Sequence, residues 1–256
     1  IEDLPKARTA VLIGTTMGEK PLEELVLAWV KSGLRDLDRQ RIMQASVNNL
    51  SANIALYFKL RGQNYLFPTA CAAGNYAIGY GFDLIRSGDM DYALAGGADA
   101  FLYVAFVGFQ SIYAMADEKC QPFDKNRKGM MLSEGAGILL LERLDLALKR
   151  GANIYAEILG YGLSCDAFHP TAPDSAGIAR AMEKALKESG ITYCDVDYIC
   201  AHGTGTPAND KVECQAIKKV LKERCKDVPV SSIKSMLGHA MGAASAIEAI
   251  ACALAV

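Results

Sequence analysis

Short apolar runs alternate along the chain with longer segments in which apolar residues follow the helical period. The short runs are typical of buried strands and lie at residues 10–13, 65–67, 92–95, 136–141, 154–160, 198–201 and 228–231. The helical segments lie at residues 22–30, 47–60, 70–86, 176–188, 210–224 and 240–256. Strands that alternate with helices predict an α/β fold. Because no Pro- or Ser-rich linker interrupts the pattern, we expect one continuous region over residues 1–256.

The charge balance and the cysteines narrow the class of protein. With 27 basic and 29 acidic residues the chain is close to neutral, which gives no indication of a nucleic-acid or membrane-surface partner. Apolar runs such as residues 138–141 are too short to cross a bilayer. The eight cysteines are scattered and include no Cys-x-x-Cys pair, so we expect mostly buried thiols in a reducing cytoplasm.

One cysteine, Cys71, lies between the apolar stretch at residues 65–67 and a run of small residues that continues as a helix to Arg86. The pattern predicts a strand, a tight turn and a helix start. At a helix N-terminus a thiol faces unpaired N–H groups and the positive end of the helix dipole, which favour the thiolate. Cys71 is therefore a candidate nucleophile. A small buried cysteine that fills the core has the same local pattern, so this alternative stays open.

Two of the chain's three histidines share the context of Cys71. His202 follows the apolar run at residues 198–201, and His239 lies beyond the run at residues 228–231. Each stands in a Gly-rich turn before a helix. Because α/β sheets present functional groups beyond the carboxyl ends of their strands, the cysteine and the two imidazoles together suggest acyl-transfer chemistry.

Several motifs stand in one order along the chain, at residues 69–74, 95–97, 122–127, 133–137, 202–207 and 234–239. In this order they resemble the β-ketoacyl-acyl-carrier-protein synthases, the condensing enzymes of the thiolase-like superfamily. The resemblance implies a thiolase-like layered α-β-α-β-α fold. It also implies that the chain is incomplete at both ends, because family members are longer before Ile1 and after Val256. Residues 128–134 depart from the family pattern, which leaves the substrate preference open.

The resemblance implies a catalytic role for five residues. Cys71 would be the nucleophile that accepts the acyl chain. His202 and His239 would act together at the malonyl thioester. Lys234 and Glu213 would form a supporting ion pair. The implied reaction is the decarboxylating condensation of fatty-acid biosynthesis, in which an acyl-cysteine and malonyl-acyl-carrier protein give a β-ketoacyl-carrier protein.

The family pattern also implies how substrates are held. Thr204 and Thr206 would hydrogen-bond the phosphopantetheine arm of an acyl carrier protein. Because that arm delivers the substrates, no cofactor and no metal are expected in the protein itself. The expected partners are the carrier protein and a second subunit, in a homodimer or a ketosynthase heterodimer. For Asp210, which begins the predicted helix, we expect the ordinary role of an N-cap.

The chemistry explains why these residue types are needed. Thiolate attack on a thioester passes through an oxyanion, which backbone N–H groups near Cys71 could stabilise. Loss of carbon dioxide from a malonyl thioester makes an enolate, whose oxygen needs hydrogen-bond donors. Two imidazoles can supply them if the protein holds the other nitrogen of each ring.

Four other interpretations compete with this one. A ketosynthase of a polyketide or polyene pathway has the same chemistry and a different pocket, and it is the nearest alternative. A non-catalytic subunit that sets chain length lacks the reactive cysteine, so Cys71 argues against it. A zinc site of Cys71, His202 and His239 lacks the short ligand spacings of structural sites. A papain-like protease gives no reason for the motif around Lys234.

Overall fold

The computed structural model describes residues 1–18, 20–33, 38–169 and 171–256. The chain forms two compact units. The first contains residues 1–108, 132–156 and 240–256, and the second contains residues 109–131 and 157–239. None of the helices in the described ranges has the length and apolar character that a membrane span requires.

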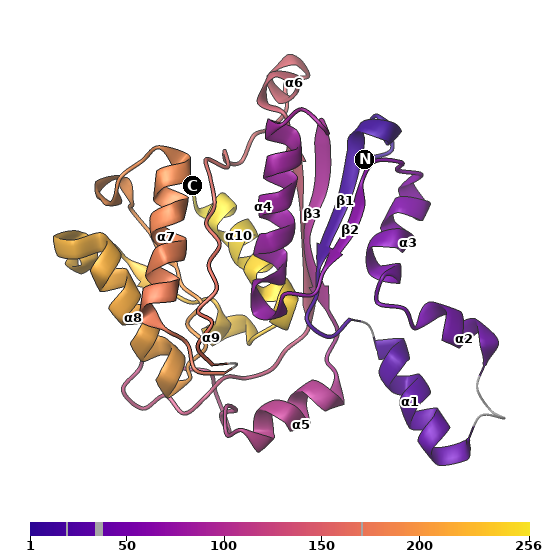
Figure 1. The fold of residues 1–256 in the computed structure, drawn as a ribbon, viewed down its shortest axis with the longest axis horizontal. Helices are drawn as coiled ribbons and strands as arrows, with labels where there is room; N and C mark the ends of the chain where they lie inside the picture. Colours follow the sequence, from indigo (N-terminus) through magenta and orange to yellow (C-terminus); the bar gives the residue numbers. More distant parts are fainter. Residues whose placement is uncertain (19, 34–37, 170) are drawn as a thin grey trace. The chain divides into compact units, whose positions relative to one another are not determined.

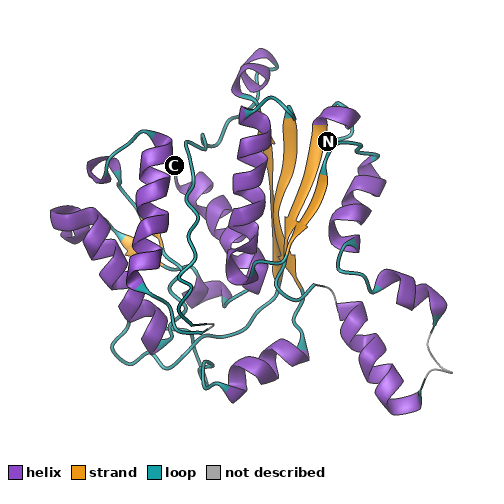
Figure 2. Ribbon diagram, in the orientation of Figure 1, coloured by secondary structure: helices purple, strands orange, loops and turns teal. Residues whose placement is uncertain are grey.

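A four-stranded sheet lies at the centre of the first unit (Figure 2). Its strands are β1 (Thr9–Gly14), β2 (Asn64–Phe67), β3 (Tyr92–Asp99) and β4 (Gly135–Glu142), in the order β2-β1-β3-β4. The first three strands run parallel, and β4 pairs antiparallel with β3. The strands predicted at residues 10–13, 65–67, 92–95 and 136–141 are confirmed.

Helices cover both faces of this sheet (Figure 1). Val11 and Ile13 of β1 pack on one face against α3 (Asn49–Phe58). Leu12 points to the other face, where α4 (Ala73–Arg86) approaches so closely that a Cβ at Gly81 would lie 3.2 Å from a Leu12 methyl carbon. Because both faces are buried, residues 10–13 of β1 are an unbroken apolar run with no polar alternation.

The first unit contains further helices and turns outside the sheet. They are helices α1 (Lys20–Ser32), α2 (Arg39–Gln44), α6 (Leu144–Lys149) and α10 (Ala244–Ala255), with 3-10 turns at Lys6–Arg8, Ala70–Ala72 and Met241–Ala243. Helix α5 (Tyr103–Ser111) contains the point in the sequence where the second unit begins. Helices α1 and α3 confirm the helices predicted at residues 22–30 and 47–60.

The second unit contains a short parallel ladder and two long helices. Its elements are β5 (Ile199–Cys200), β6 (Val230–Ser231), α7 (Ser175–Ser189), α8 (Pro207–Leu221) and α9 (Lys234–Leu237), with 3-10 turns at Tyr193–Asp195 and Lys222–Lys226. Ala179 of α7 packs against Ala216 and Val220 of α8 in a buried cluster. The apolar side chains of both helices therefore form the core of this unit.

The strand predicted at residues 154–160 is wrong, because these residues form no strand in the described structure. A strand needs a neighbouring strand to satisfy its backbone groups, and among the described residues β5 and β6 pair only with each other. The segment runs instead beside α7, where a Cβ at Gly160 would lie 2.7 Å from the Ser189 nitrogen. Its apolar pattern reflects contact with a helix.

The three parallel strands of the first unit place their carboxyl ends at one edge of the sheet. In the register of the sheet, Gly14 of β1 lies opposite Phe67 of β2 and Gly97 of β3. The segment that contains Cys71 leaves the sheet at this edge, directly after β2. This is the edge at which α/β folds present reactive groups.

The close approach of β3 and β4 can be tested by substitution. A Cβ at Gly96 would lie 2.0 Å from the carbonyl oxygen of Gly137, so the strands must separate to admit a larger residue. We expect Gly96→Ala to lower the free energy of unfolding by about 2 kcal/mol or more, measured by urea denaturation. As a control, Gly108→Ala enters open space on α5 and should change stability by at most about 1 kcal/mol. A Gly96→Ala protein as stable as the wild type contradicts the packing described.

Candidate active site

Cys71 stands in a 3-10 turn between the end of β2 and the start of α4. The predicted order of strand, turn and helix start is confirmed. Ala70, just before the cysteine, has a φ of 52°, in the left-handed region that costs an ordinary residue free energy. The surrounding structure must therefore hold this turn in place.

Close contacts hold the Cys71 turn from two sides. On one side β1 approaches so closely that a Cβ at Gly14 would lie 2.2 Å from the Ala73 carbonyl carbon. On the other side a Cβ at Gly74 would lie 2.8 Å from the Ser245 hydroxyl oxygen. The Asn75 N–H donates to that same hydroxyl at 3.1 Å. The start of α4 is thus held between β1 and the start of α10.

In the second unit, charged side chains bind the backbone N–H and the carbonyl oxygen of His202. The two oxygens of the Glu213 carboxylate accept the N–H groups of His202 and Gly203, at 2.7 and 2.8 Å. The Lys234 ammonium donates to the His202 carbonyl oxygen at 2.8 Å. Both predicted supporting residues therefore bind the His202 backbone. Their direct ion pair stays a prediction.

Lys234 also constrains the imidazole of His202. Its Nζ lies 3.5 Å from the ring Nδ1. An ammonium group can only donate, so the nitrogen that faces it acts as an acceptor and the ring proton resides on Nε2. The arrangement leaves the Nε2–H group as the donor of His202.

His239 is the second imidazole of this unit. Its backbone N–H donates to the Met131 carbonyl oxygen at 2.7 Å, and only 1% of the residue is exposed. The centroids of the His202 and His239 rings lie 5.4 Å apart, with an interplanar angle of 83°. The structure thus brings the two predicted histidines together.

Both histidines are held neutral. Burial, and then the positive charge of Lys234, lower the pKa of His202 to about 3. Burial also lowers the pKa of His239 well below its usual value, and His202 and Lys234 lower it further. At neutral pH each ring therefore carries one N–H group and no charge, as a hydrogen-bond donor to an oxyanion requires.

The two predicted binding residues, Thr204 and Thr206, lie at the start of α8. Their hydroxyl oxygens are 2.9 Å apart. Thr206 is the N-cap of the helix and accepts the N–H of Asn209. The expectation that Asp210 is the N-cap is wrong, because Pro207 occupies the first helical position and the helix begins earlier than predicted.

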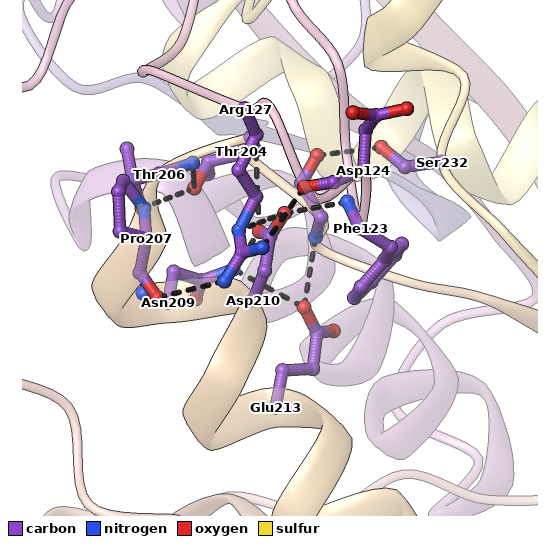
Figure 3. A network of polar contacts seen from close by, with 12 residues as sticks. Phe123, Asp124, Arg127, Thr204, Thr206, Pro207, Asn209, Asp210, Glu213 and Ser232 are labelled. Carbon is purple, nitrogen blue, oxygen red and sulfur yellow. Dashed lines mark hydrogen bonds and ion pairs between the residues drawn. The ribbon is translucent and has the colours of Figure 1, made fainter.

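Asp210 instead links two loops through a buried carboxylate (Figure 3). It is 1% exposed and accepts the N–H groups of Phe123, at 2.7 Å, and Gly205, at 3.2 Å. The Arg127 guanidinium lies 3.5 Å away and donates to the Pro207 carbonyl oxygen. This network was not predicted from the sequence, although the Pro207 signal for an earlier helix start indicates that Asp210 has another partner.

Gly203, next to His202, shows how tightly these loops pack. Its φ is 41°, and a Cβ there would lie 2.5 Å from the Cβ of Ser232 and 2.9 Å from the ring of Phe123. The Ser232 hydroxyl donates to the Gly203 carbonyl oxygen at 2.8 Å. Only glycine suits this position, because both the space and the backbone angle exclude a side chain.

Two family descriptions match nearly all of the chain. The family description "Beta-ketoacyl synthase, N-terminal domain" matches residues 1–147, and "Beta-ketoacyl synthase, C-terminal domain" matches residues 155–256. The chain belongs to the β-ketoacyl synthase family. It is 42% identical to the 3-oxoacyl-[acyl-carrier-protein] synthase 2 of Rhizobium meliloti, over 99% of this chain and 63% of that protein.

Solved structures of β-ketoacyl synthases share the fold. The ishigamide ketosynthase/chain length factor is 46% identical with a TM-score of 0.95, over 100% of this chain and 64% of that one. The AntDE:AntF complex, a type II polyketide ketosynthase with its acyl-carrier protein, is 35% identical with a TM-score of 0.94, over 98% of this chain and 66% of that one. The predicted thiolase-like α/β fold is confirmed. The chain spans 63% to 66% of the length of these relatives.

The lowered pKa of His202 has a consequence for stability. A histidine whose folded pKa lies near 3 binds no proton until well below the value near 6.5 of the unfolded chain. Its contribution to stability is therefore complete above about pH 6.5 and is lost as the pH falls from there toward 3. We expect the free energy of unfolding to fall over this range by up to about 1.4 kcal/mol per pH unit for this residue.

The matched measurement compares two histidine variants by urea denaturation between pH 7 and pH 4. His202→Asn should show a flatter fall in stability than the wild type, because it lacks the buried imidazole. His169→Asn is the control, because His169 is exposed, and it should keep the wild-type slope. Equal slopes in all three proteins contradict the neutral state of His202.

Proposed function

We propose that the protein carrying this chain catalyses a decarboxylating condensation in fatty-acid biosynthesis. An acyl group on Cys71 is joined to malonyl-acyl-carrier protein, and the product is a β-ketoacyl-carrier protein. The observation that carries the proposal is the pair of neutral imidazoles, His202 and His239, whose ring centroids lie 5.4 Å apart. The membership of the β-ketoacyl synthase family supports it.

The first step is acyl transfer to Cys71. The thiolate sulfur attacks the carbonyl carbon of the incoming thioester, and the carrier's thiolate leaves and takes up a proton. The position of Cys71 just before α4 supports this step, because the first N–H groups of a helix have no intrahelical partner and favour negative charge.

The second step is the loss of carbon dioxide from the malonyl group. The bond to the carboxylate carbon breaks, and its electron pair moves onto the thioester oxygen as an enolate. His202 and His239 donate hydrogen bonds to that oxygen. Lys234 contributes by holding Nδ1 of His202 as an acceptor. The enolate carbon then attacks the acyl carbonyl, and the Cys71 thiolate leaves.

Thr204 and Thr206 would hold the arm of the carrier. One of their hydroxyl protons is used in the bond between them, and the other would donate to the ligand. The arm's amides supply acceptors for such a donor. Since the phosphopantetheine arrives with the carrier, the proposal needs no resident cofactor and no metal.

The proposed partners are an acyl carrier protein and a second ketosynthase-like subunit, in a homodimer or a heterodimer. Two similar proteins support both: AntDE:AntF is a ketosynthase in complex with its acyl-carrier protein, and the ishigamide protein is a ketosynthase/chain length factor. The eight cysteines form no disulfide with one another, which supports a cytoplasmic location.

A polyketide pathway is the second candidate. The specific observation in its favour is the similarity to the AntDE:AntF ketosynthase, a type II polyketide enzyme, at 35% identity and a TM-score of 0.94. Both reactions use the same residues. Incubation with a panel of fatty-acid and polyketide carrier proteins, followed by product analysis, separates them.

The role of Cys71 is tested by intact-mass spectrometry of the full-length protein after incubation with acyl-carrier protein. We expect the wild type to gain the mass of one acyl group and Cys71→Ala to gain none. Cys165→Ala is the matched control, because Cys165 is an exposed free thiol, and it should acylate normally. Acylation that persists in Cys71→Ala means that another residue is the nucleophile.

The role of the histidines is tested by carbon dioxide release from malonyl-acyl-carrier protein. His202→Ala and His239→Ala should each reduce the rate by about 10²–10³, the usual effect of losing an oxyanion donor. Because the two act as a unit, the double variant should lose less than the product of the single losses. His169→Ala serves as the control and should keep the wild-type rate. A near-normal rate in either single variant removes that histidine from the mechanism.

A further inference from the structure

Asp99, the last residue of β3, carries a buried carboxylate that binds four donors. The residue is 5% exposed. One oxygen accepts the Thr15 hydroxyl at 2.7 Å and the Met17 N–H at 3.1 Å. The other accepts the Thr16 N–H at 2.8 Å and the Gly242 N–H at 2.6 Å. The reaction proposed above uses none of these bonds.

The four donors belong to two segments that are far apart in the sequence. Thr15, Thr16 and Met17 directly follow β1, whereas Gly242 lies in the turn that precedes α10. An ionised carboxylate only accepts hydrogen bonds and so can bind all four groups at once. Asp99 therefore fixes the end of β1 and the start of α10 to the same point on β3.

These two segments are the ones that pack against the Cys71 turn. The Thr15 N–H donates to the Phe67 carbonyl oxygen at 3.1 Å, at the end of the strand that leads to Cys71. From the other side, the Ser245 hydroxyl accepts the Asn75 N–H at the start of α4. Asp99 is thus connected to the Cys71 turn through both segments that pack against that turn.

The backbone gives a reason why such support is needed. Ala70 and Met241 have φ angles of 52° and 50°, which ordinary residues adopt only where the surroundings compensate. Ala70 adjoins Cys71, and Met241 adjoins the Gly242 N–H that Asp99 binds. A loss of the carboxylate removes a bond next to one of the two strained residues.

We propose that Asp99 is a positioning residue for the nucleophile: it holds the end of β1 and the start of α10 so that the Cys71 thiol stays at the start of α4. The inference rests on the proposed function, in which Cys71 accepts the acyl chain. Asp99 acts through the backbone and does not touch the substrate.

The test measures how Cys71 reacts with iodoacetamide as a function of pH, by peptide mass spectrometry of the full-length protein. In Asp99→Asn the amide nitrogen offers no acceptor, so the donors that face it lose their partner. We expect the midpoint of the alkylation profile to rise by about half a pH unit, because the thiolate is held less firmly at the helix N-terminus. At neutral pH the rate should fall about threefold.

Asp91→Asn is the matched control for stability. Asp91 precedes the first residue of the same strand and binds Arg8 and Arg143, at 2.9 and 2.8 Å. Its loss should lower the melting temperature but leave the alkylation profile of Cys71 unchanged. An Asp99→Asn profile identical to the wild type, or an equal shift in Asp91→Asn, overturns the proposal.

A milder variant keeps the test decisive if Asp99→Asn does not fold. Thr15→Val removes a single hydroxyl bond to Asp99 and should shift the profile in the same direction by a smaller amount. An unchanged profile in a folded Thr15→Val protein, when Asp99→Asn cannot be measured, counts against the proposal. Alkylation needs no acyl substrate, so its result is independent of whether Cys71 is acylated by the carrier protein, which the intact-mass experiment decides.

Discussion

The geometry of the histidine segment depends on how the second unit accommodates the buried charge of Lys234. The side chain is 1% exposed, and burying an ammonium group is costly unless acceptors surround it. The His202 carbonyl oxygen and the ring Nδ1 provide them. One lysine therefore fixes both the backbone and the protonation pattern of the same histidine.

Buried carboxylates bind backbone N–H groups of the loops in both units. Glu213 accepts the N–H groups of His202 and Gly203. Asp210 and Asp99 each accept N–H groups from two separate loops. Charged acceptors make stronger hydrogen bonds than neutral ones, so each carboxylate holds backbone that regular secondary structure leaves unpaired. The loops that carry the candidate residues are thereby fixed to one another.

Small residues allow the loops that carry the candidate residues to pack closely against their neighbours. Gly14 and Gly74 admit the backbone on either side of the Cys71 turn, and Gly203 admits Ser232 beside His202. The chemistry of the proposed reaction depends on this closeness. A neutral imidazole or a thiolate acts on a thioester only when its atoms are fixed within hydrogen-bond reach.

The sequence by itself determined the strands of the first unit, the turn at Cys71 and the two histidine turns, because these follow from apolar runs and from glycines within a few residues. Only the tertiary structure decided which groups the buried charges bind. Asp210 binds Phe123, 87 residues away, and Asp99 binds Gly242, 143 residues away. The strand predicted at residues 154–160 is wrong for the same reason, because the partners of that segment also come from elsewhere in the chain. A local pattern shows that a segment is apolar or that a carboxylate is present, but the partner that satisfies its hydrogen bonds comes from a distant part of the chain.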